Sequence, residues 1–547
     1  MNYKIDINLT YVLTGGLLFN YLFWREELAL NLVIYSLFIL ILYQFKHKFF
    51  NNKKLVLIAA SHVIACTLLL FNHSVLTVVT WYISLFVLVG YMHNVQLRSI
   101  FTSLAAAFVQ FLAAPVSLIK KITAIEIGGF SFKPLLKFVK YIIIPSLILF
   151  VFSIVYSIAN PFFGSYIGTF FEQVSNVINT IFTFFFKDVS FERILFLVVG
   201  VLFSTGVLIT FKNGLEKMES GLNTKLLRTK RDRKKQSLWR EMGTLFTGNL
   251  MNKKMALKTE NTIAIISFTG LNLLLLFLNG IDISTLWMGN LGSLNFSQAL
   301  HGSTNALIIS IVMAMAVILY FFNGNLNFYS KNKIIRFLAY GWIIQNTFLI
   351  LSVLLRDYHY MDMHGLTYKR IGVVVFSLLC FVGLLTVYLK VAQQKTFFYL
   401  FRTNGAIWYI LLITAGIINW DVFIVDYNMS KRNSATLDVS YLMSLSDKTL
   451  PRLIENKELL KKYLSPNTSR YTYPSDVIEG SIDTTSSKKP VIDSVEVNKR
   501  IKQSLALNFE KNLAHRAKKI NANFQKTTWL SWNYRDWQTE QYLNEHK

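Results

Sequence analysis

Long apolar segments alternate with short polar segments along the first 420 residues of this chain. Each apolar segment is close to the ~20 residues that an α-helix needs to cross a bilayer. We therefore predict eleven membrane spans: Leu9–Trp24, Leu28–Tyr43, Leu55–Phe71, Val75–Tyr91, Tyr141–Ala159, Ile194–Phe211, Thr262–Leu278, Asn305–Phe322, Phe337–Leu355, Ile371–Leu389 and Ala406–Trp420.

The composition favours the same class of protein. Hydrophobic residues make up 53% of the 547 positions and charged residues only 16%, whereas soluble domains carry about 25% charged residues. We predict an all-α fold, a polytopic transmembrane helical bundle with a small soluble helical C-terminal domain. A soluble all-α protein is the alternative, and the repeated uncharged runs argue against it.

Charge predicts the orientation. With the N-terminus in the cytoplasm, the loops on that side hold 30 Lys and Arg residues, against 6 in the loops on the other side. Cytoplasmic loops of membrane proteins collect Lys and Arg, which also explains the net charge of +26. We expect a bacterial inner (cytoplasmic) membrane protein with a cytoplasmic N-terminus and an extracytoplasmic C-terminal tail.

Two further apolar segments have mixed character. Ser99–Ile119 is Ala-rich and precedes two lysines, which suggests a helix in the cytoplasmic interface or a re-entrant helix. Tyr166–Phe186 places polar residues on one face and Phe and Ile on the other, so we predict an amphipathic helix at the outer leaflet.

Three regions are expected: an N-terminal membrane region at 1–190, a membrane core at 191–420 and a tail at 421–547. Helical spacing marks Ala435–Leu464 and Val491–Gln525, and a Ser/Thr/Pro-rich linker spans 465–490. The aromatic segment Trp529–Trp537 is expected to pack back on the tail or to lie in the membrane interface.

The loop Lys212–Lys258 carries 13 basic residues. We expect it to contact the anionic lipid headgroups of the bilayer at the cytoplasmic surface. Its basic centre holds no interleaved aromatic side chains, so nucleic acid is not an expected partner. Binding of a cytoplasmic protein is the alternative.

The candidate functional site is the polar stretch Leu354–Arg370 between two predicted spans, together with nearby outer residues. We expect Asp362 and Asp421 to pair with Arg356 and Arg370. Gly365 suits a turn and Thr367 suits the cap of the next helix. The predicted collar of ligand-binding or ion-paired residues is His301, Arg356, Asp357, His359, Asp362, His364, Thr367, Arg370 and Asp421.

Three interpretations of this collar remain. It either fixes the outer ends of the spans and docks the tail, or binds an anionic small molecule or lipid headgroup through its arginines. Alternatively, His301, His359, Asp362 and His364 offer metal ligands, but their spacing matches no metal signature and the adjacent basic residues repel a cation. We predict no metal and no cofactor.

The predicted spans contain no Asp, Glu, Lys or Arg in their apolar interiors. Buried ionisable residues mark ion pathways in transporters, so their absence disfavours coupled transport. The milder polar residues His62, Asn272, Gln345 and Asn346 remain. We expect a hydrogen-bonded packing role for His62 and interhelical hydrogen bonds for the three amides.

Several short motifs in order resemble one family. They are HGLTYKR at His364–Arg370, FSQALHGSTNALIISI at Phe296–Ile311, NWDVFIVDYN at Asn419–Asn428, LDVSYLMSLS at Leu437–Ser446 and SWNY at Ser531–Tyr534. Together they are similar to a bacterial multi-pass membrane family of unknown function, of the domain-of-unknown-function 4153/4173 type. The resemblance covers about residues 190 to 547 and implies architecture without chemistry.

No hydrolase, phosphate-loop, zinc-protease or dinucleotide motif is found in the sequence. We therefore favour a non-enzymatic sensor or scaffold whose outer collar and tail bind an envelope protein partner, a lipid or a small molecule. The alternatives are a transporter or channel through spans seven to ten, and a membrane-embedded enzyme that acts on lipid-linked substrates. A path beside Asn272, Gln345 and Asn346 would favour transport.

Overall fold

The computed structural model describes residues 7–123, 126–127, 130–131, 145, 149–150, 152–185, 190–212, 214–227, 257–288, 296–322, 325–431, 437–464 and 494–546. These residues form two compact units that exchange short segments. Unit 1 contains residues 1–220, 415–417 and 525–537, and unit 2 contains residues 221–414, 418–524 and 538–547. Residues 421–547, expected as one tail, are thus divided between the two units. The predicted domain boundaries stay a prediction.

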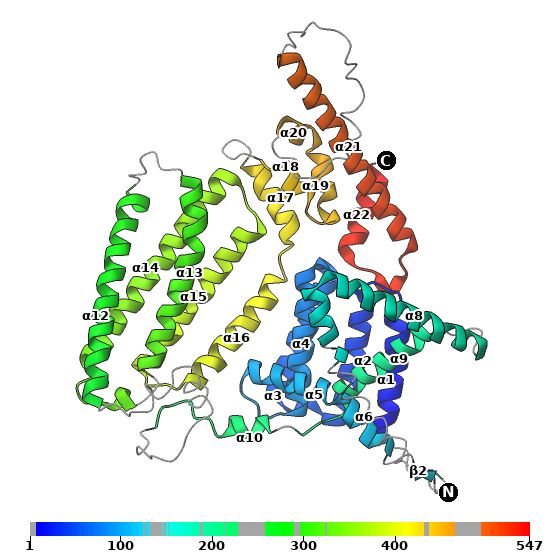
Figure 1. Cartoon of the computed structure of the whole chain (residues 1–547), viewed down its shortest axis with the longest axis horizontal. Helices are drawn as coiled ribbons and strands as arrows, with labels where there is room; N and C mark the ends of the chain where they lie inside the picture. The colour runs from blue at the N-terminus through cyan, green and yellow to red at the C-terminus, as the bar shows by residue number, and fades with distance from the viewer. Residues whose placement is uncertain are drawn as a thin grey trace. The chain divides into compact units, whose positions relative to one another are not determined.

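Unit 1 is built from apolar helices (Figure 1). Its elements are α1 (Ile7–Phe23), α2 (Leu30–His47), η1 (Phe49–Asn51), α3 (Lys53–Asn72), α4 (Val75–His93), α5 (Ile100–Leu112), α6 (Ala114–Thr123), the paired strands β1 (Glu126–Ile127) and β2 (Phe130–Ser131), α8 (Pro161–Phe185), α9 (Phe191–Leu208), α10 (Leu215–Ser220) and η8 (Trp529–Ser531). A final helix, α22 (Tyr534–Glu545), begins in unit 1 and ends in unit 2.

Glycines allow α1 and α9 to pack closely. A Cβ on Gly16 would lie 2.4 Å from Val201 Cγ2, and a Cβ on Gly200 would lie 2.8 Å from the Phe19 ring. Small residues at a helix contact let two backbones approach, which is how membrane helices gain packing without a hydrophobic driving force. The packing of α1 against α9 therefore depends on glycines, whose role at a helix contact cannot be read from hydropathy.

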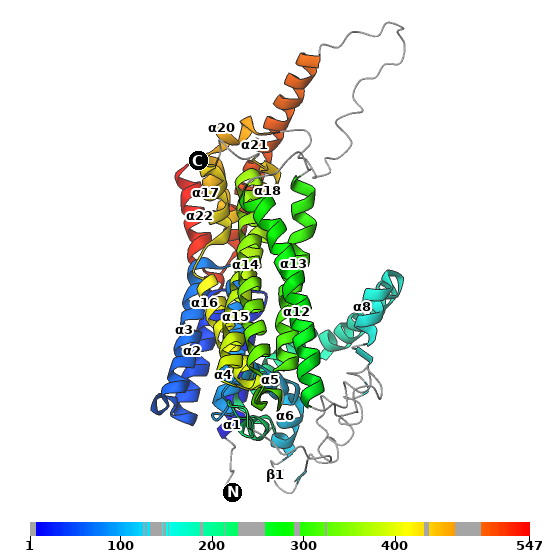
Figure 2. The ribbon, with the colours of Figure 1, turned by 90° about the vertical axis from the view of Figure 1, so that its left-hand side faces the viewer.

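Unit 2 combines a helical bundle with a smaller helical region. Its elements are α12 (Leu257–Asp282), the π-helical turn η3 (Ile283–Trp287), α13 (Phe296–Phe321), η4 (Asn325–Phe328), α14 (Lys333–His364), α15 (Tyr368–Ala392), α16 (Phe397–Ala415), α17 (Trp420–Ser430), α18 (Val439–Met443), η5 (Asp447–Thr449), α19 (Leu450–Glu455), α20 (Lys457–Lys462) and α21 (Ser494–Lys526). Figures 1 and 2 both show α12, α13, α14 and α15 side by side.

The bundle has an aromatic and aliphatic core. Phe268 of α12 lies edge-on to Trp342 of α14, with ring centroids 5.5 Å apart, and both side chains are almost fully buried. Leu384 and Val387 of α15 complete the core from the other side. Close packing of these side chains holds the helices together through van der Waals contacts.

The predicted all-α class is confirmed, but the predicted count of eleven spans is not. Within the described residues, seven helices are long and apolar enough to cross a membrane, or eight if α5 and α6 form one span bent by 50°. Three other predicted spans are shorter apolar helices, at Ile7–Phe23, Leu30–Lys46 and Leu307–Phe321. Of the predicted span at Tyr141–Ala159, residues 152–159 are helical, and eight of its 19 positions lie outside the described residues.

We call α17 to α20 together with α21 the helical cap. The predicted helical character of Ala435–Leu464 and Val491–Gln525 is confirmed, whereas the expected linker at 465–490 lies outside the described residues. One cluster of buried side chains joins these helices: Ile424, Val425, Leu437, Val439, Leu442, Leu445, Leu450, Leu453, Leu460, Phe509 and Leu513. Leu366, from the connection between α14 and α15, belongs to the same cluster.

Candidate functional site

The expected polar loop is much shorter than predicted. Helix α14 continues through the charged residues to His364, and α15 begins at Tyr368, so only Gly365–Thr367 lies outside the helices. The predicted span ends at Leu355, where the charged residues begin. In the structure the polar turns stay helical because cap residues and neighbouring helices supply hydrogen-bond and ion-pair partners for their side chains.

Gly365 and Asn428 hold the connection between α14 and α15. Gly365 has φ +75°, and a Cβ at this position would lie 2.3 Å from Asn428 Oδ1. The buried Asn428 side chain accepts a hydrogen bond from the Leu366 amide (2.6 Å) and donates one to the Leu366 carbonyl (3.0 Å). Asn428 therefore satisfies both backbone groups of a buried residue, as a neighbouring strand would.

Arg370 closes the C-terminal end of α14. Its guanidinium donates to the carbonyls of His364 (3.0 Å) and Gly365 and lies 4.4 Å from the centre of the Tyr360 ring. Tyr360 in turn stacks on His364, with ring centroids 4.4 Å apart. A cation at a helix C-terminus satisfies the last carbonyls and complements the helix dipole.

Asp421 joins the start of α15 to the cap. Its carboxylate accepts hydrogen bonds from the Tyr368 hydroxyl (2.7 Å) and the Ser446 hydroxyl (2.5 Å). The Tyr368 amide donates to the Tyr441 hydroxyl at 3.0 Å. Burial raises the pKa of the Tyr441 hydroxyl, which therefore stays neutral.

The expected ion pairs are replaced by others. Arg356 pairs with Asp282 at the end of α12, and Lys431 pairs with Asp362 at 2.7 Å. The predicted partners Asp362 and Asp421 thus serve other groups. The sequence could not reveal these partners, because α12 runs beyond its predicted apolar end and places Asp282 beside Arg356.

The remaining collar residues have varied surroundings. Asp357 is buried, and its Oδ2 atom has no hydrogen-bond partner in the described part of the chain. His359 is partly buried beside Tyr358. Thr367 occupies the N-cap position of α15, as predicted, but without a side-chain capping bond. The side chain of His301 lies outside the described residues.

Metal ligation has no built site here. Among the described residues, no three His, Cys, Asp or Glu side chains gather as ligands. Asp362 is engaged by Lys431, and His364 stacks on Tyr360. The arrangement can hold helices together through charge-assisted hydrogen bonds.

The intramembrane polar residues act in packing. Gln345 Nε2 donates to Asn272 Oδ1 (2.9 Å), and Asn272 Nδ2 donates across to the Leu338 carbonyl (3.0 Å), which confirms two of the three predicted interhelical amides. Asn346 instead donates to the Trp342 carbonyl of its own helix (2.8 Å), so that prediction is wrong. A short polar side chain within a helix can bond the carbonyl four residues earlier in this way.

His62 fits the predicted packing role. Its side chain is fully buried, and its two ring nitrogens lie 2.7 Å from Ser84 Oγ and 3.1 Å from Ser36 Oγ. A histidine with both nitrogens paired to hydroxyls is hydrogen-bonded core.

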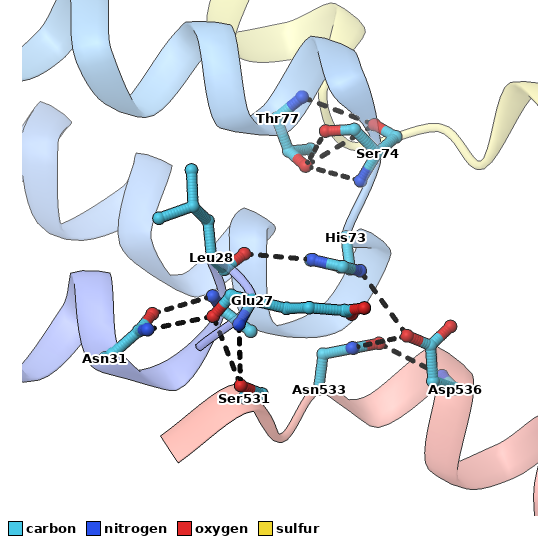
Figure 3. A network of polar contacts seen from close by, with 10 residues as sticks. Glu27, Leu28, Asn31, His73, Ser74, Thr77, Ser531, Asn533 and Asp536 are labelled. Atoms are coloured by element: carbon cyan, nitrogen blue, oxygen red, sulfur yellow. Dashed lines mark hydrogen bonds and ion pairs between the residues drawn. The ribbon is translucent and has the colours of Figure 1, made fainter. Parts of the chain in front are cut away.

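A polar clamp in unit 1 was missed by sequence reasoning (Figure 3). The Ser531 hydroxyl accepts from the Glu27 amide (2.9 Å) and lies 2.7 Å from Glu26 Oε2. His73 Nε2 donates to the Leu28 carbonyl (3.0 Å), and its Nδ1 lies 3.6 Å from Asp536 Oδ2. The SWNY motif and the aromatic segment Trp529–Trp537 marked this part of the chain, but neither predicted contact with the turns that carry Glu27 and His73.

The clamp brings three distant segments together. Asn31 shapes the α1–α2 turn by accepting from the Ala29 amide (2.8 Å) and donating to the Glu27 carbonyl (2.8 Å). Ser74 and Thr77 form a capping box at the start of α4, which fixes the turn that carries His73. Residues 528–536 thus contact two turns, each of which is stabilised by its own local hydrogen bonds.

Comparison with known proteins gives a family and no activity. Neither the curated proteins nor the solved structures contain a match to this chain. One family model, described as a domain of unknown function (DUF4153), matches residues 54–456. The match includes most of both units and reaches further toward the N-terminus than the motifs of the sequence analysis. The chain is an integral membrane protein of unestablished activity and belongs to this DUF4153 family.

Proposed function

We propose that this protein is a non-enzymatic membrane scaffold whose helical cap binds an acidic partner protein of the envelope. The observation that carries the proposal is that Arg370 and Asp421 of the collar bind other groups of the same chain. Leu366 lies in the cap core, and Asn428 satisfies both of its backbone groups. Because these polar residues join the membrane helices to the helical cap, a structural role of the collar is favoured over ligand chemistry.

The cap offers one strongly basic helix for such a partner. On its inner face, Phe509 and Leu513 are buried, and Arg516 binds Asp447 at 2.6 Å. On the opposite, exposed side of the helix lie Lys511, His515, Lys518 and Lys519. Opposite charge on a partner would steer its approach and fix its register.

The bundle interior supports the scaffold over a transporter. Asn272 and Gln345 bond to each other beside a core of buried aromatic and aliphatic residues. A transport path would instead need polar groups that line water or ions. An enzyme would need a reactive constellation at the collar, where Arg370 and Asp421 are engaged by helix carbonyls and hydroxyls.

The test is site-specific photo-crosslinking in living cells, with the photoreactive amino acid at residue 515 of the full-length protein, on the same exposed side of α21 as Lys511 and Lys518. We expect one protein adduct, which is lost when Lys511→Glu and Lys518→Glu are combined. The reason is that reversing two charges converts attraction into repulsion at an interface with an acidic surface.

Lys457→Glu with Lys462→Glu is the matched control, because it makes the same charge change on exposed residues of α20. This control should keep the adduct. Absence of any adduct, or an adduct that persists after reversal of Lys511 and Lys518, would count against the proposal.

A further inference from the structure

An apolar groove runs along unit 1 between α2 and α3. It encloses about 640 Å³. Ten of its eleven lining residues are apolar, and Gln44 accepts a hydrogen bond from the Phe50 amide (3.3 Å). The lining residues are Leu40, Ile41, Gln44, Phe45, Phe49, Phe50, Val56, Ala59, Ala60, Val63 and Ile64.

The turn between the two helices shapes one end of the groove. Lys48 has a left-handed backbone, with φ 45°, and leads into η1. Phe49 is buried beneath the turn, whereas Phe50 and Phe45 are 64% and 74% exposed and flank the groove. Such open aromatic walls suit a flexible hydrocarbon chain more than water.

Basic residues gather at this same turn. Lys46 and Lys54 hold carbonyls elsewhere in unit 1, at Leu208 and Leu97, while Lys48 and Lys53 are exposed. Residues 28–125 contain no Asp or Glu, so this segment has no carboxylate of its own to neutralise the lysines. The turn is therefore complementary to an anion.

The dimensions match one leaflet. From Val56 to Ile64 the groove follows nine residues of α3, or about 12 Å of helix axis. Half of a hydrocarbon core is about 15 Å thick. A lipid whose headgroup lies at Lys48 and Lys53 would place its acyl chain along the groove.

From this geometry we infer that the α2–η1–α3 groove is a binding site for an anionic phospholipid of the surrounding bilayer. The lysines of the turn bind the phosphate-bearing headgroup, and the groove holds one acyl chain. Basic pockets beside membrane helices are suited to anionic headgroups. The site shares no residue with the basic loop 212–258 or with the collar.

The test uses the full-length protein in phosphatidylcholine vesicles. A small amount of one of two photoreactive probes is added, and the probes carry the same photoreactive acyl chain on either phosphatidylglycerol or phosphatidylcholine. Labelled peptides are then identified by mass spectrometry. We expect the phosphatidylglycerol probe to label residues 40–64 about 25-fold more, because each of the two exposed lysines near the headgroup contributes about a factor of five in binding. An excess of unlabelled phosphatidylglycerol should remove this labelling, and that result requires no variant.

Two variant pairs separate the groove from its rim. Ala60→Trp fills the groove and should abolish the labelling, whereas Leu57→Trp, at an exposed α3 residue outside the groove, should not. Lys48→Gln with Lys53→Gln should reduce phosphatidylglycerol labelling to the phosphatidylcholine level. Lys120→Gln with Lys121→Gln on α6 should leave it unchanged.

Three results would overturn the inference. Equal labelling of the wild-type protein by both probes would remove the headgroup preference. Undiminished labelling of Ala60→Trp would remove the groove. Quantitative disulfide formation between copies of Phe45→Cys would show that a second copy of the chain covers this face.

Discussion

Single residues at the α14–α15 connection fix how the membrane helices meet the cap. Gly365 takes a backbone conformation that side chains rarely adopt, and the space beside it is filled by Asn428. Asn428 spends its amide on Leu366, whose side chain lies in the cap core. Gly365 and Asn428 thus decide whether the helical cap can pack on this connection.

Gly365→Ala tests this dependence. We expect a loss of about 2 kcal/mol or more in unfolding free energy, because the new Cβ meets strain and displaces the Asn428 carbonyl group. Thermal unfolding of the detergent-solubilised protein measures the loss, and limited proteolysis within 437–464 reports release of the cap.

Gly372→Ala provides the control. This glycine lies in α15 with open space where a Cβ would stand. Alanine there should be neutral or stabilise by up to about 1 kcal/mol, as expected for an exposed helix interior. Equal destabilisation by both substitutions would show that the Gly365 conformation has no special role.

Between elements, the ion pair of α12 and α14 is the most buried contact of the collar. The Arg356 and Asp282 side chains are 13% and 2% exposed. A buried pair is weak evidence of net stabilisation, but removal of one partner leaves an uncompensated charge. Single and double substitutions should therefore behave differently.

We expect Arg356→Met and Asp282→Asn each to destabilise the protein, Arg356→Met by about 3 to 5 kcal/mol. The double variant should recover most of the Arg356→Met loss, because it leaves no lone charge. Denaturant unfolding in detergent measures all three. Arg452→Met, in an ion pair whose side chains are about half exposed, should cost about 1 kcal/mol or less. Additive losses in the double variant would contradict a coupled pair.

The clamp of unit 1 joins η8 to the α1–α2 turn and carries a third expectation. Ser531→Ala removes the hydroxyl that contacts Glu26 and the Glu27 amide, so residues 525–537 should lose about 1 to 2 kcal/mol of local stability. Hydrogen exchange should rise in those residues. Ser430→Ala, which loses only a local bond to Tyr427, should leave that exchange unchanged; a global rise would argue against a local clamp.

Element identity was readable from sequence, while element ends and partners were not. Apolar runs of helical length predicted α3, α4, α9, α12, α14 and α15, because burial in a bilayer needs no knowledge of neighbours. The polar last turns of α14 are helical because partners such as Asp282 and Lys431 stabilise them. These partners lie 74 and 69 positions away along the chain, so the local sequence did not reveal them. Likewise, Gly16 and Val201 meet because of shape, which no hydropathy pattern encodes.

At the scale of the whole molecule, the contacts within unit 1 sort its loops into two sets. In unit 1 the turns at Glu26–Glu27 and His73 meet residues 528–536, and all three segments were predicted outside the cytoplasm. At the other ends of the helices, Lys46 meets the Leu208 carbonyl and Arg98 meets Glu219. Most of these segments were predicted cytoplasmic. Charge counting and three-dimensional contact thus agree on the grouping of the loops, and the absolute orientation stays a prediction.

Labelling of single cysteines from one side of the membrane tests both the grouping and the orientation. The native Cys66 and Cys380 are buried, so an impermeant maleimide should ignore them. With intact cells we expect Glu26→Cys and Thr528→Cys to be labelled, and Lys48→Cys only after permeabilisation, since charged segments cannot cross the apolar core. Labelling of residues 26 and 528 from opposite sides would refute the contact between Thr528 and Glu26. If residues 26 and 528 are both labelled only after permeabilisation, the contact between them stands and the predicted orientation is inverted. The reason is that their contact places the two residues on the same side of the membrane, whichever side that is.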